Sequence, residues 1–305
     1  MKIAIMGTGG VGGYFGAKLA LGGHDVSFIA RGAHLEAINA HGLRVESPLG
    51  DMHVTNADAT ASPGEIGPVD VVLIAVKLWD LEAAAEACIP LLNYDTLVLP
   101  FQNGITASET VGEVLSTNHV GAGIAKVQAV IAEPGVIRHL KAFASLEFGE
   151  TDNARSPRLN QFHNACRGCG IDATVPDDIS VAIWQKFIFL VAMSGLTAAA
   201  RSPIGAIFAT EEGTRTFLAC TREVAAVGLE CGVQLSSDIA ETITAFAQTH
   251  EYATSTSQRA DLERGNRLEL PWLTGAVCNL ARQLGIPTPV NDAIYTVLSP
   301  YSMGV

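Results

Sequence analysis

Three glycines near the N-terminus have the spacing of a dinucleotide-binding turn. Gly7, Gly9 and Gly12 lie in the run GTGGVG, between a short apolar strand at residues 2–6 and a helix at residues 11–21. In such a pattern the glycines permit a tight turn, a close approach of backbone to a pyrophosphate, and close packing of helix on strand. The pyrophosphate would lie at the positive N-terminal end of the helix. The residues expected to hold the dinucleotide are Gly7, Thr8, Gly9, Gly10, Val11 and Gly12.

The end of the second expected strand indicates which dinucleotide is bound. Gly22 and Gly23 end the helix, and DVSFIA at residues 25–30 has the pattern of a strand. Folds that bind NAD usually place an acidic residue here, on the ribose 2′-hydroxyl, whereas an arginine accommodates a 2′-phosphate. In this chain the strand is followed by Arg31. Arg31 favours NADP(H), although a solvated arginine at a strand end is the alternative.

Two further polar groups follow expected strands. Lys77 comes directly after the apolar run Val69–Val76, and the pair Gln102-Asn103 follows the run 96–101. In open α/β sheets, ligands bind outside the carboxyl ends of the strands. Either group alone could be a solvated loop residue. Their shared position favours a role for Lys77 and Asn103 at the nicotinamide end of the cofactor and at the substrate.

Two charged residues in the C-terminal half lie in apolar surroundings. Lys186 is part of AIWQKFIFLVAM, a helix that is apolar on nearly all sides and therefore expected to be buried. A lysine that loses water has a lowered pKa and can donate a proton near neutral pH. Glu269 stands between two leucines, directly before Pro271, where its carboxylate could orient a substrate or pair with Lys186. The alternatives are a lysine that reaches solvent and an acid that stabilises a helix N-terminus.

The elements that must position these residues divide the chain into two parts. Up to residue 175, apolar strands alternate with helices, which predicts a doubly wound, mostly parallel sheet. The later strands are expected at Val69–Val76, Thr96–Phe101, Val120–Val130 and Phe143–Phe148, and the later helices at Leu81–Ile89, Ser108–Leu115 and Leu159–Gly168. From residue 176, helical patterns follow at Ile179–Ala200, Glu211–Cys231, Ser237–Glu251 and Pro271–Leu284. We therefore expect an α/β Rossmann domain at 1–175 and an all-α substrate domain at 176–305, with the ligand site between them.

Composition narrows the function classes. With 305 residues, 48% of them hydrophobic and 16% charged, the chain is expected to fold compactly. A net charge of −12 argues against a nucleic-acid or anionic-membrane surface. We expect no secretory signal, because Met1-Lys2 leads directly into the first strand, and we expect the apolar run Phe187–Ala200 to be too short to span a bilayer. We expect a cytoplasmic protein.

The cysteines are not expected to bind a metal. Cys166 and Cys169 form a C-x-x-C, but zinc needs a second ligand pair at suitable spacing and the chain has none. A redox pair would be expected to open a helix after a strand, whereas this one lies just before Gly170. Small thiols in a reducing compartment are the simpler interpretation.

Taken together, these residues resemble the ketopantoate reductases (2-dehydropantoate 2-reductases), and the similarity covers nearly the whole chain. It rests on GTGGVGG, Arg31, the VK-x-W segment at Lys77, QNG at 102–104, IWQK at Lys186 and the S-x-x-x-D-L-x-x-G-x-x-x-E run from Ser257 to Glu269. The combination is far more specific than any single piece.

The resemblance implies NADPH-dependent reduction of a 2-oxo acid to a 2-hydroxy acid, first of all 2-dehydropantoate to (R)-pantoate in pantothenate biosynthesis. By this resemblance Lys186 is the general acid and Glu269 holds the substrate or cofactor. Lys77 and Asn103 order the nicotinamide and the keto acid, and Ser257 binds the substrate. The only partner implied is the small 2-oxo acid, without nucleic acid or membrane, and a homodimer is left open.

The chain departs from the family around the expected substrate. Relatives typically have asparagines one and two helical turns after the lysine, where this chain has Leu190 and Ser194, and another where it has Thr254. The family's I-D-x-x-N-G after the glutamate is replaced by LPWLTG. Ser194 is kept as a candidate substrate ligand. A pocket that loses amides should favour a less polar substrate. The alternatives are therefore a 2-hydroxyacid dehydrogenase for branched or aromatic 2-keto acids, and a non-catalytic NADP(H)-sensing protein.

Overall fold

The computed structural model describes residues 1–304, which form two compact units. The first contains residues 1–102 and 106–179, and the second contains residues 103–105 and the chain from residue 180 onward. The boundary expected at 175/176 falls shortly before this division. The structure also differs in assigning Asn103–Ile105, which follows a strand of the first unit, to the second.

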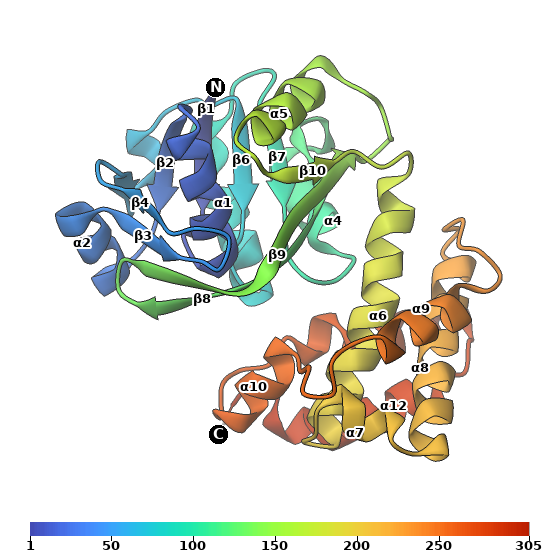
Figure 1. Ribbon diagram of the computed structural model, residues 1–305. Coiled ribbons are helices and arrows are strands. Elements are labelled where there is room, and N and C mark those ends of the chain that lie inside the picture. The colour runs from blue at the N-terminus through green and yellow to red at the C-terminus, as the bar shows by residue number, and fades with distance from the viewer. Residues whose placement is uncertain (305) are drawn as a thin grey trace. The chain divides into compact units, whose positions relative to one another are not determined.

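A five-stranded parallel sheet forms the centre of the first unit (Figure 1). Its order is β5-β2-β1-β6-β7, and every neighbouring pair is parallel. The strands are β1 (Lys2–Met6), β2 (Asp25–Ile29), β5 (Asp58–Thr60), β6 (Val71–Ile74) and β7 (Leu97–Pro100). Every residue of β6 and β7 is buried, as continuous apolar strands with both faces covered should be. The strand order reverses at β1, the position where open α/β sheets bind ligands.

Five α-helices belong to the first unit. They are α1 (Gly10–Leu21), α2 (Gly32–His41), α3 (Leu81–Ala87), α4 (Ala107–Leu115) and α5 (Pro157–Gly168). The predicted fold class, an α/β domain followed by a helical one, is confirmed.

A second sheet was not expected. It has the order β10-β9-β3-β4, with β8 paired antiparallel to β9. Its strands are β3 (Leu43–Glu46), β4 (Met52–Val54), β8 (Gly121–Glu133), β9 (Val136–Glu150) and β10 (Asp172–Thr174). The segments at 120–130 and 143–148 were predicted as strands of one doubly wound sheet. That placement is wrong, because only a short turn at Pro134-Gly135 joins β8 to β9, and such a connection makes an antiparallel hairpin.

The second unit consists of helices (Figure 1). They are α6 (Ile179–Ala199), α7 (Ile204–Phe208), α8 (Glu211–Glu230), α9 (Ile239–Gln248), α10 (Ser257–Glu263), α11 (Thr274–Leu284) and α12 (Pro289–Leu298). Trp184, Phe187 and Ile188 of α6 pack in one apolar core with residues of α8 and α11.

The length of α6 corrects one expectation. The apolar run 187–200 alone is too short for a membrane, but the helix extends back to Ile179, and its 21 residues are long and apolar enough to span one. More than half of its most apolar stretch is buried inside the protein, as in the core helix of a soluble fold. It is the one such helix within residues 1–304.

The helix predicted from Pro271 is interrupted. Pro271 lies in a 3₁₀ turn, Leu270–Trp272, and α11 begins only at Thr274. Leu273, with φ −102° and ψ −101°, separates the two. Gly285 ends α11 in the left-handed conformation (φ +72°), as predicted.

Candidate functional site

The glycine turn is tied to the ends of its neighbouring strands. Gly7 has φ +101°, and a Cβ there would lie 2.8 Å from Cγ1 of Val76, just after β6. The N–H groups of Gly7 and Thr8 donate to the carbonyl of Ile29, the last residue of β2, at 3.3 and 3.0 Å. The Thr8 hydroxyl donates to the same carbonyl at 3.0 Å. The turn is therefore held at the point where the strand order reverses.

The glycines of the turn are required for different reasons. A Cβ at Gly10 would lie 2.0 Å from the carbonyl oxygen of Ala129, and a Cβ at Gly12 would lie 2.2 Å from that of Gly7. These two glycines are required by the packing of the protein itself. A Cβ at Gly9 would meet no atom within 4 Å, and its φ of −85° suits any residue. The fold leaves the face of Gly9 open, as close approach of a ligand to the backbone requires.

The start of α1 suits an anion. The first N–H groups of a helix have no intrahelical partner, and the helix dipole makes this end positive. Gly9 occupies the capping position without a side chain to bind these groups, and the first turn of α1 contains no acidic residue. These residues fit the pyrophosphate of a dinucleotide.

Arg31 carries an uncompensated charge. It is exposed, precedes α2 and forms no ion pair with any residue in the range 1–304. An exposed guanidinium at the end of β2 has the chemistry to bind a phosphate.

The carboxyl end of β6 carries Lys77 and is fixed by Gln102. Lys77 is exposed, with its ammonium 5.6 Å from the ring centroid of Trp79. The Gln102 amide is buried, and its Nε2 donates to the carbonyls of Ile74 and Val76, each at 3.1 Å. Its Oε1 is buried without a hydrogen-bond partner in the described chain. The sequence marked Gln102 only as a polar neighbour of Asn103, because pairing with carbonyls of another strand leaves no local signal.

In the second unit, Lys186 and Asn103 are in direct contact. The Lys186 Nζ, on α6, donates to Oδ1 of Asn103 at 3.0 Å, and both residues are half-buried. The next residue, Gly104, has φ +108°, and a Cβ there would lie 3.2 Å from the carbonyl oxygen of Trp272. The turn that carries Asn103 thus packs against the segment that follows Glu269.

Glu269 is an enclosed acid. It is 8% exposed, and the leucines on either side of it are fully buried. Its carbonyl accepts the N–H groups of Trp272 and Leu273 at 3.0 and 3.2 Å, which fixes the break between the 3₁₀ turn and α11. Its predicted pairing with Lys186 stays a prediction.

The remaining predicted substrate ligands differ in exposure. Ser257 is exposed at the first position of α10, where the Thr256 hydroxyl accepts the N–H of Arg259. Ser194, on α6, is only 1% exposed. Leu190 and Thr254, which replace family asparagines, are half-buried.

One buried amide escaped the sequence-based prediction. Gln258 on α10 is buried, and neither its Oε1 nor its Nε2 has a hydrogen-bond partner among residues 1–304. In the polar run TSTSQR it resembles a surface residue. The hydroxyl of Thr274, at the start of α11, is likewise buried and unpartnered in that range.

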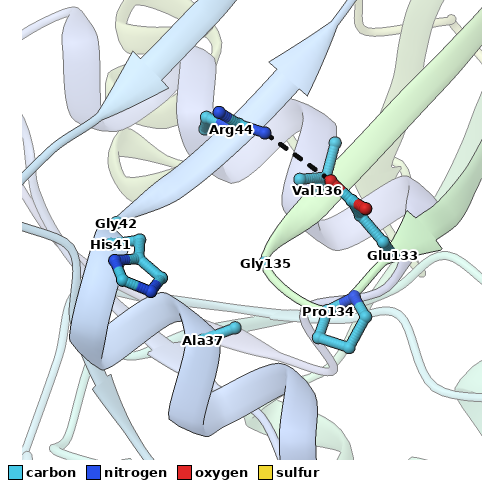
Figure 2. A pocket seen from close by; sticks show the side chains of 8 residues that line it. All are labelled: Ala37, His41, Gly42, Arg44, Glu133, Pro134, Gly135 and Val136. Carbon is cyan, nitrogen blue, oxygen red and sulfur yellow. Dashed lines mark ion pairs between the residues drawn. The ribbon is translucent and has the colours of Figure 1, made fainter.

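A small depression lies elsewhere in the first unit and involves none of the predicted residues (Figure 2). Its volume of about 170 Å³ is below the range typical of small-molecule sites. An ion pair between Arg44 and Glu133, 3.6 Å apart, crosses it. It is lined by Ala37, His41, Gly42, Arg44, Glu133, Pro134, Gly135 and Val136.

Of the two C-x-x-C cysteines, Cys166 is buried in the first unit and Cys169 is half-buried. Burial raises the pKa of both the Cys166 and the Cys169 thiol, which disfavours the reactive thiolate. A Cβ on Gly22 would lie 2.1 Å from Sγ of Cys169, so the cysteine packs closely against this glycine. Within residues 1–304 there is no group of three or more His, Cys, Asp or Glu residues suited to a metal ion.

Comparison with known proteins places both units in one family. Residues 3–153 match the family described as Ketopantoate reductase PanE/ApbA, and residues 178–302 match its C-terminal counterpart. The chain is 34% identical over 321 residues to the 2-dehydropantoate 2-reductase of Mesorhizobium japonicum, covering 98% of this chain and 97% of the relative. It is 30% identical over 301 residues to the uncharacterized oxidoreductase YkpB of Bacillus subtilis, covering 99% of both.

A solved structure agrees with these matches. The crystal structure of a PanE/ApbA family ketopantoate reductase from Ralstonia eutropha is similar with a TM-score of 0.90 and 32% identity, covering 99% of this chain and 98% of that one. The resemblance inferred from the sequence motifs is thereby confirmed.

Proposed function

Because this chain belongs to the ketopantoate reductase family, we propose that it reduces 2-dehydropantoate to (R)-pantoate with NADPH, in the cytoplasm and for pantothenate biosynthesis. Family membership makes it an oxidoreductase acting on CH–OH groups, with a nicotinamide dinucleotide as cofactor. The observation that carries the proposal is the 3.0 Å hydrogen bond between Lys186 and Asn103.

The first unit supplies the groups for the cofactor. The open face of Gly9 and the N-terminus of α1 suit its pyrophosphate, and the exposed Arg31 suits a 2′-phosphate, which favours NADPH over NADH. Lys77 and Asn103 are proposed to order the nicotinamide end. When bound, the cofactor supplies the hydride.

The second unit supplies the proton. Reduction of a ketone adds a hydride to carbon and a proton to oxygen, and Lys186 is proposed as the proton donor. Its ammonium has three N–H donors. Asn103 Oδ1 accepts one of them, which fixes the direction of Nζ.

Other residues are proposed to hold the 2-oxo acid. Ser257 and Lys77 are exposed, so they can bind polar groups of a substrate without a conformational change that exposes them. The enclosed Glu269 is proposed to orient the substrate through its carboxylate. Ser194 is proposed as a further ligand, although its burial requires a substrate that reaches into the helical core.

The substrate is tested by comparing kcat/KM for 2-dehydropantoate, 2-ketoisovalerate and phenylglyoxylate, each with NADPH and with NADH. We expect 2-dehydropantoate with NADPH to give the highest value. No turnover of 2-dehydropantoate, with turnover of one of the others, would instead support a dehydrogenase for branched or aromatic 2-keto acids, which the half-buried Leu190 in place of an asparagine favours. NADPH binding without turnover of any keto acid would support the NADP(H)-sensing alternative.

A further inference from the structure

His34 connects three segments of the first unit. It lies on α2, three residues after Arg31, and its Nε2 is 2.8 Å from the carbonyl oxygen of Thr8 in the glycine turn. The N–H of Gly135, in the turn between β8 and β9, donates to its Nδ1 at 3.0 Å. Because Nδ1 accepts a hydrogen bond, the ring hydrogen lies on Nε2, which donates to Thr8. Burial lowers the pKa of His34, in agreement with a neutral ring.

Holding the Thr8 carbonyl sets the direction of the next amide. The C=O of Thr8 and the N–H of Gly9 belong to one peptide unit, and in a trans peptide they point in opposite directions. Residues 1–304 contain no cis peptide bond. The Gly9 N–H has no hydrogen-bond partner in this range, and the face of Gly9 is open to at least 4 Å. His34 therefore fixes the direction of an unused donor in the glycine turn.

The hairpin of β8 and β9 supports this arrangement. A Cβ on Gly135 (φ +77°) would lie 3.1 Å from Cβ of Ala37, so the hairpin turn packs directly on α2 (Figure 2). The same hairpin meets the start of α1, where the carbonyl of Ala129 leaves no room for a side chain at Gly10. The glycine turn is thus in contact with the hairpin directly, and through His34 as well.

We propose that His34 is a positioning residue of the cofactor site, which holds the Gly9 N–H in the direction in which it donates to the pyrophosphate of the dinucleotide. The N–H and the hydroxyl of Thr8 both donate to the carbonyl of Ile29 at the end of β2. The carbonyl of Thr8 does not bind this strand end and is held by His34 instead. This inference rests on the proposed binding of a nicotinamide dinucleotide.

The test compares two variants of the full-length protein by the Kd for NADPH and for NADH, measured by cofactor fluorescence. Both dinucleotides contain the pyrophosphate, so His34→Leu should weaken both by about the same factor, on the order of 10-fold. Arg31→Ala is the matched control, because it should weaken NADPH and leave NADH nearly unchanged. His34→Gln, which keeps a donor and an acceptor, should recover most of the loss.

Kinetics and stability separate positioning from a merely structural role. The KM for the dinucleotide should rise in His34→Leu, while kcat at saturating cofactor and the KM for the keto acid stay unchanged. A lowered Tm with unchanged Kd for both dinucleotides would overturn the inference, as would a loss confined to NADPH. If His34→Leu does not fold, His34→Asn, whose shorter side chain cannot reach both partners, replaces it with the same expected results.

The proposed function can fail separately. A wild-type protein that binds neither dinucleotide would overturn the proposed function and this inference together. A wild-type protein that binds both, with an equally tight His34→Leu variant, would overturn this inference alone.

Discussion

The Nζ of Lys186 donates a 3.0 Å hydrogen bond to Oδ1 of Asn103, although the two residues are 83 positions apart in the chain. Asn103 follows the last strand of the parallel sheet, yet residues 103–105 group with the helical unit that contains Lys186. The geometry of the pair is therefore set within one compact unit.

Removing the acceptor should impair turnover. Asn103→Ala removes the hydrogen bond that the Lys186 ammonium donates to Oδ1, and hydrogen bonds to charged groups contribute about 1.5–3 kcal/mol. We expect kcat for the preferred keto acid to fall by roughly 10- to 100-fold. Gln185→Ala, which changes the exposed neighbour of Lys186 on the same helix, is the control and should retain wild-type kcat. Equal kcat in Asn103→Ala and wild type would contradict a role for the pair.

The glycines of the turn should separate binding from stability. Gly9→Ala should leave Tm unchanged, because its Cβ would meet no protein atom, but should weaken NADPH binding by roughly tenfold or more by crowding the ligand. Gly12→Ala should lower stability by about 1–3 kcal/mol or more, because its Cβ would lie 2.2 Å from a backbone oxygen. Thermal unfolding and cofactor titration of both variants check this. A destabilised Gly9→Ala variant would show that the face of Gly9 is not open.

Breaking a buried ion pair should destabilise the first unit strongly. Arg158 donates to both carboxylate oxygens of Glu150 at 2.8 Å, and the two side chains are only 14% and 7% exposed. Hydrogen bonding to Glu150 raises the pKa of Arg158. Glu150→Ala strands a buried guanidinium and should cost about 3–5 kcal/mol in the free energy of unfolding.

The control is an exposed ion pair between Arg138, which lies on β9 like Glu150, and Glu46 on β3. Arg138 and Glu46 are 2.7 Å apart but about half exposed, so Arg138→Ala should change the free energy of unfolding by no more than about 1 kcal/mol. Urea unfolding of both variants measures the difference. Equal losses of unfolding free energy in the two variants would mean that burial does not increase the contribution of the Arg158–Glu150 pair to stability.

His34 should make stability depend on pH in a defined direction. Its pKa lies below the ordinary value of 6.5, so between the folded value and 6.5 the unfolded chain binds more protons than the folded one. The contribution of neutral His34 is therefore complete above pH 6.5 and decreases as the pH falls below it. His24 has a lowered pKa as well, so the measurement is the difference between wild type and His34→Gln from pH 7.5 to 5. The free energy of unfolding of wild type minus that of His34→Gln should decrease as the pH falls. A value that does not change with pH would contradict the account.

The parallel sheet could be predicted because its features are local. Buried parallel strands are continuous apolar runs, and the glycine turn lies directly between a strand and a helix. The second sheet was not predicted from the sequence, because β3 and β4 are short and partly exposed. The antiparallel pairing of β8 with β9 was also missed, because the residues near the turn that joins them have no strand pattern in the sequence.

The residues of the candidate site could be predicted only where a local sequence pattern marks them. Lys186 and Glu269 stood out as charges in apolar runs, and Arg31 and Asn103 by their place at strand ends. His34 did not, because its partners Thr8 and Gly135 are 26 and 101 residues away and no local pattern marks such contacts. Gln102 escaped for the same reason, since its amide binds carbonyls of another strand.

The central claim is that Lys186 donates the proton in a reduction driven by NADPH, and Lys186→Ala tests it most directly. Loss of a general acid should lower kcat for the preferred 2-oxo acid by about 100- to 10,000-fold. The Kd for NADPH and the Tm, measured on the same preparation, should stay close to wild type. Turnover by Lys186→Ala at the wild-type rate, with NADPH bound normally, would contradict the account.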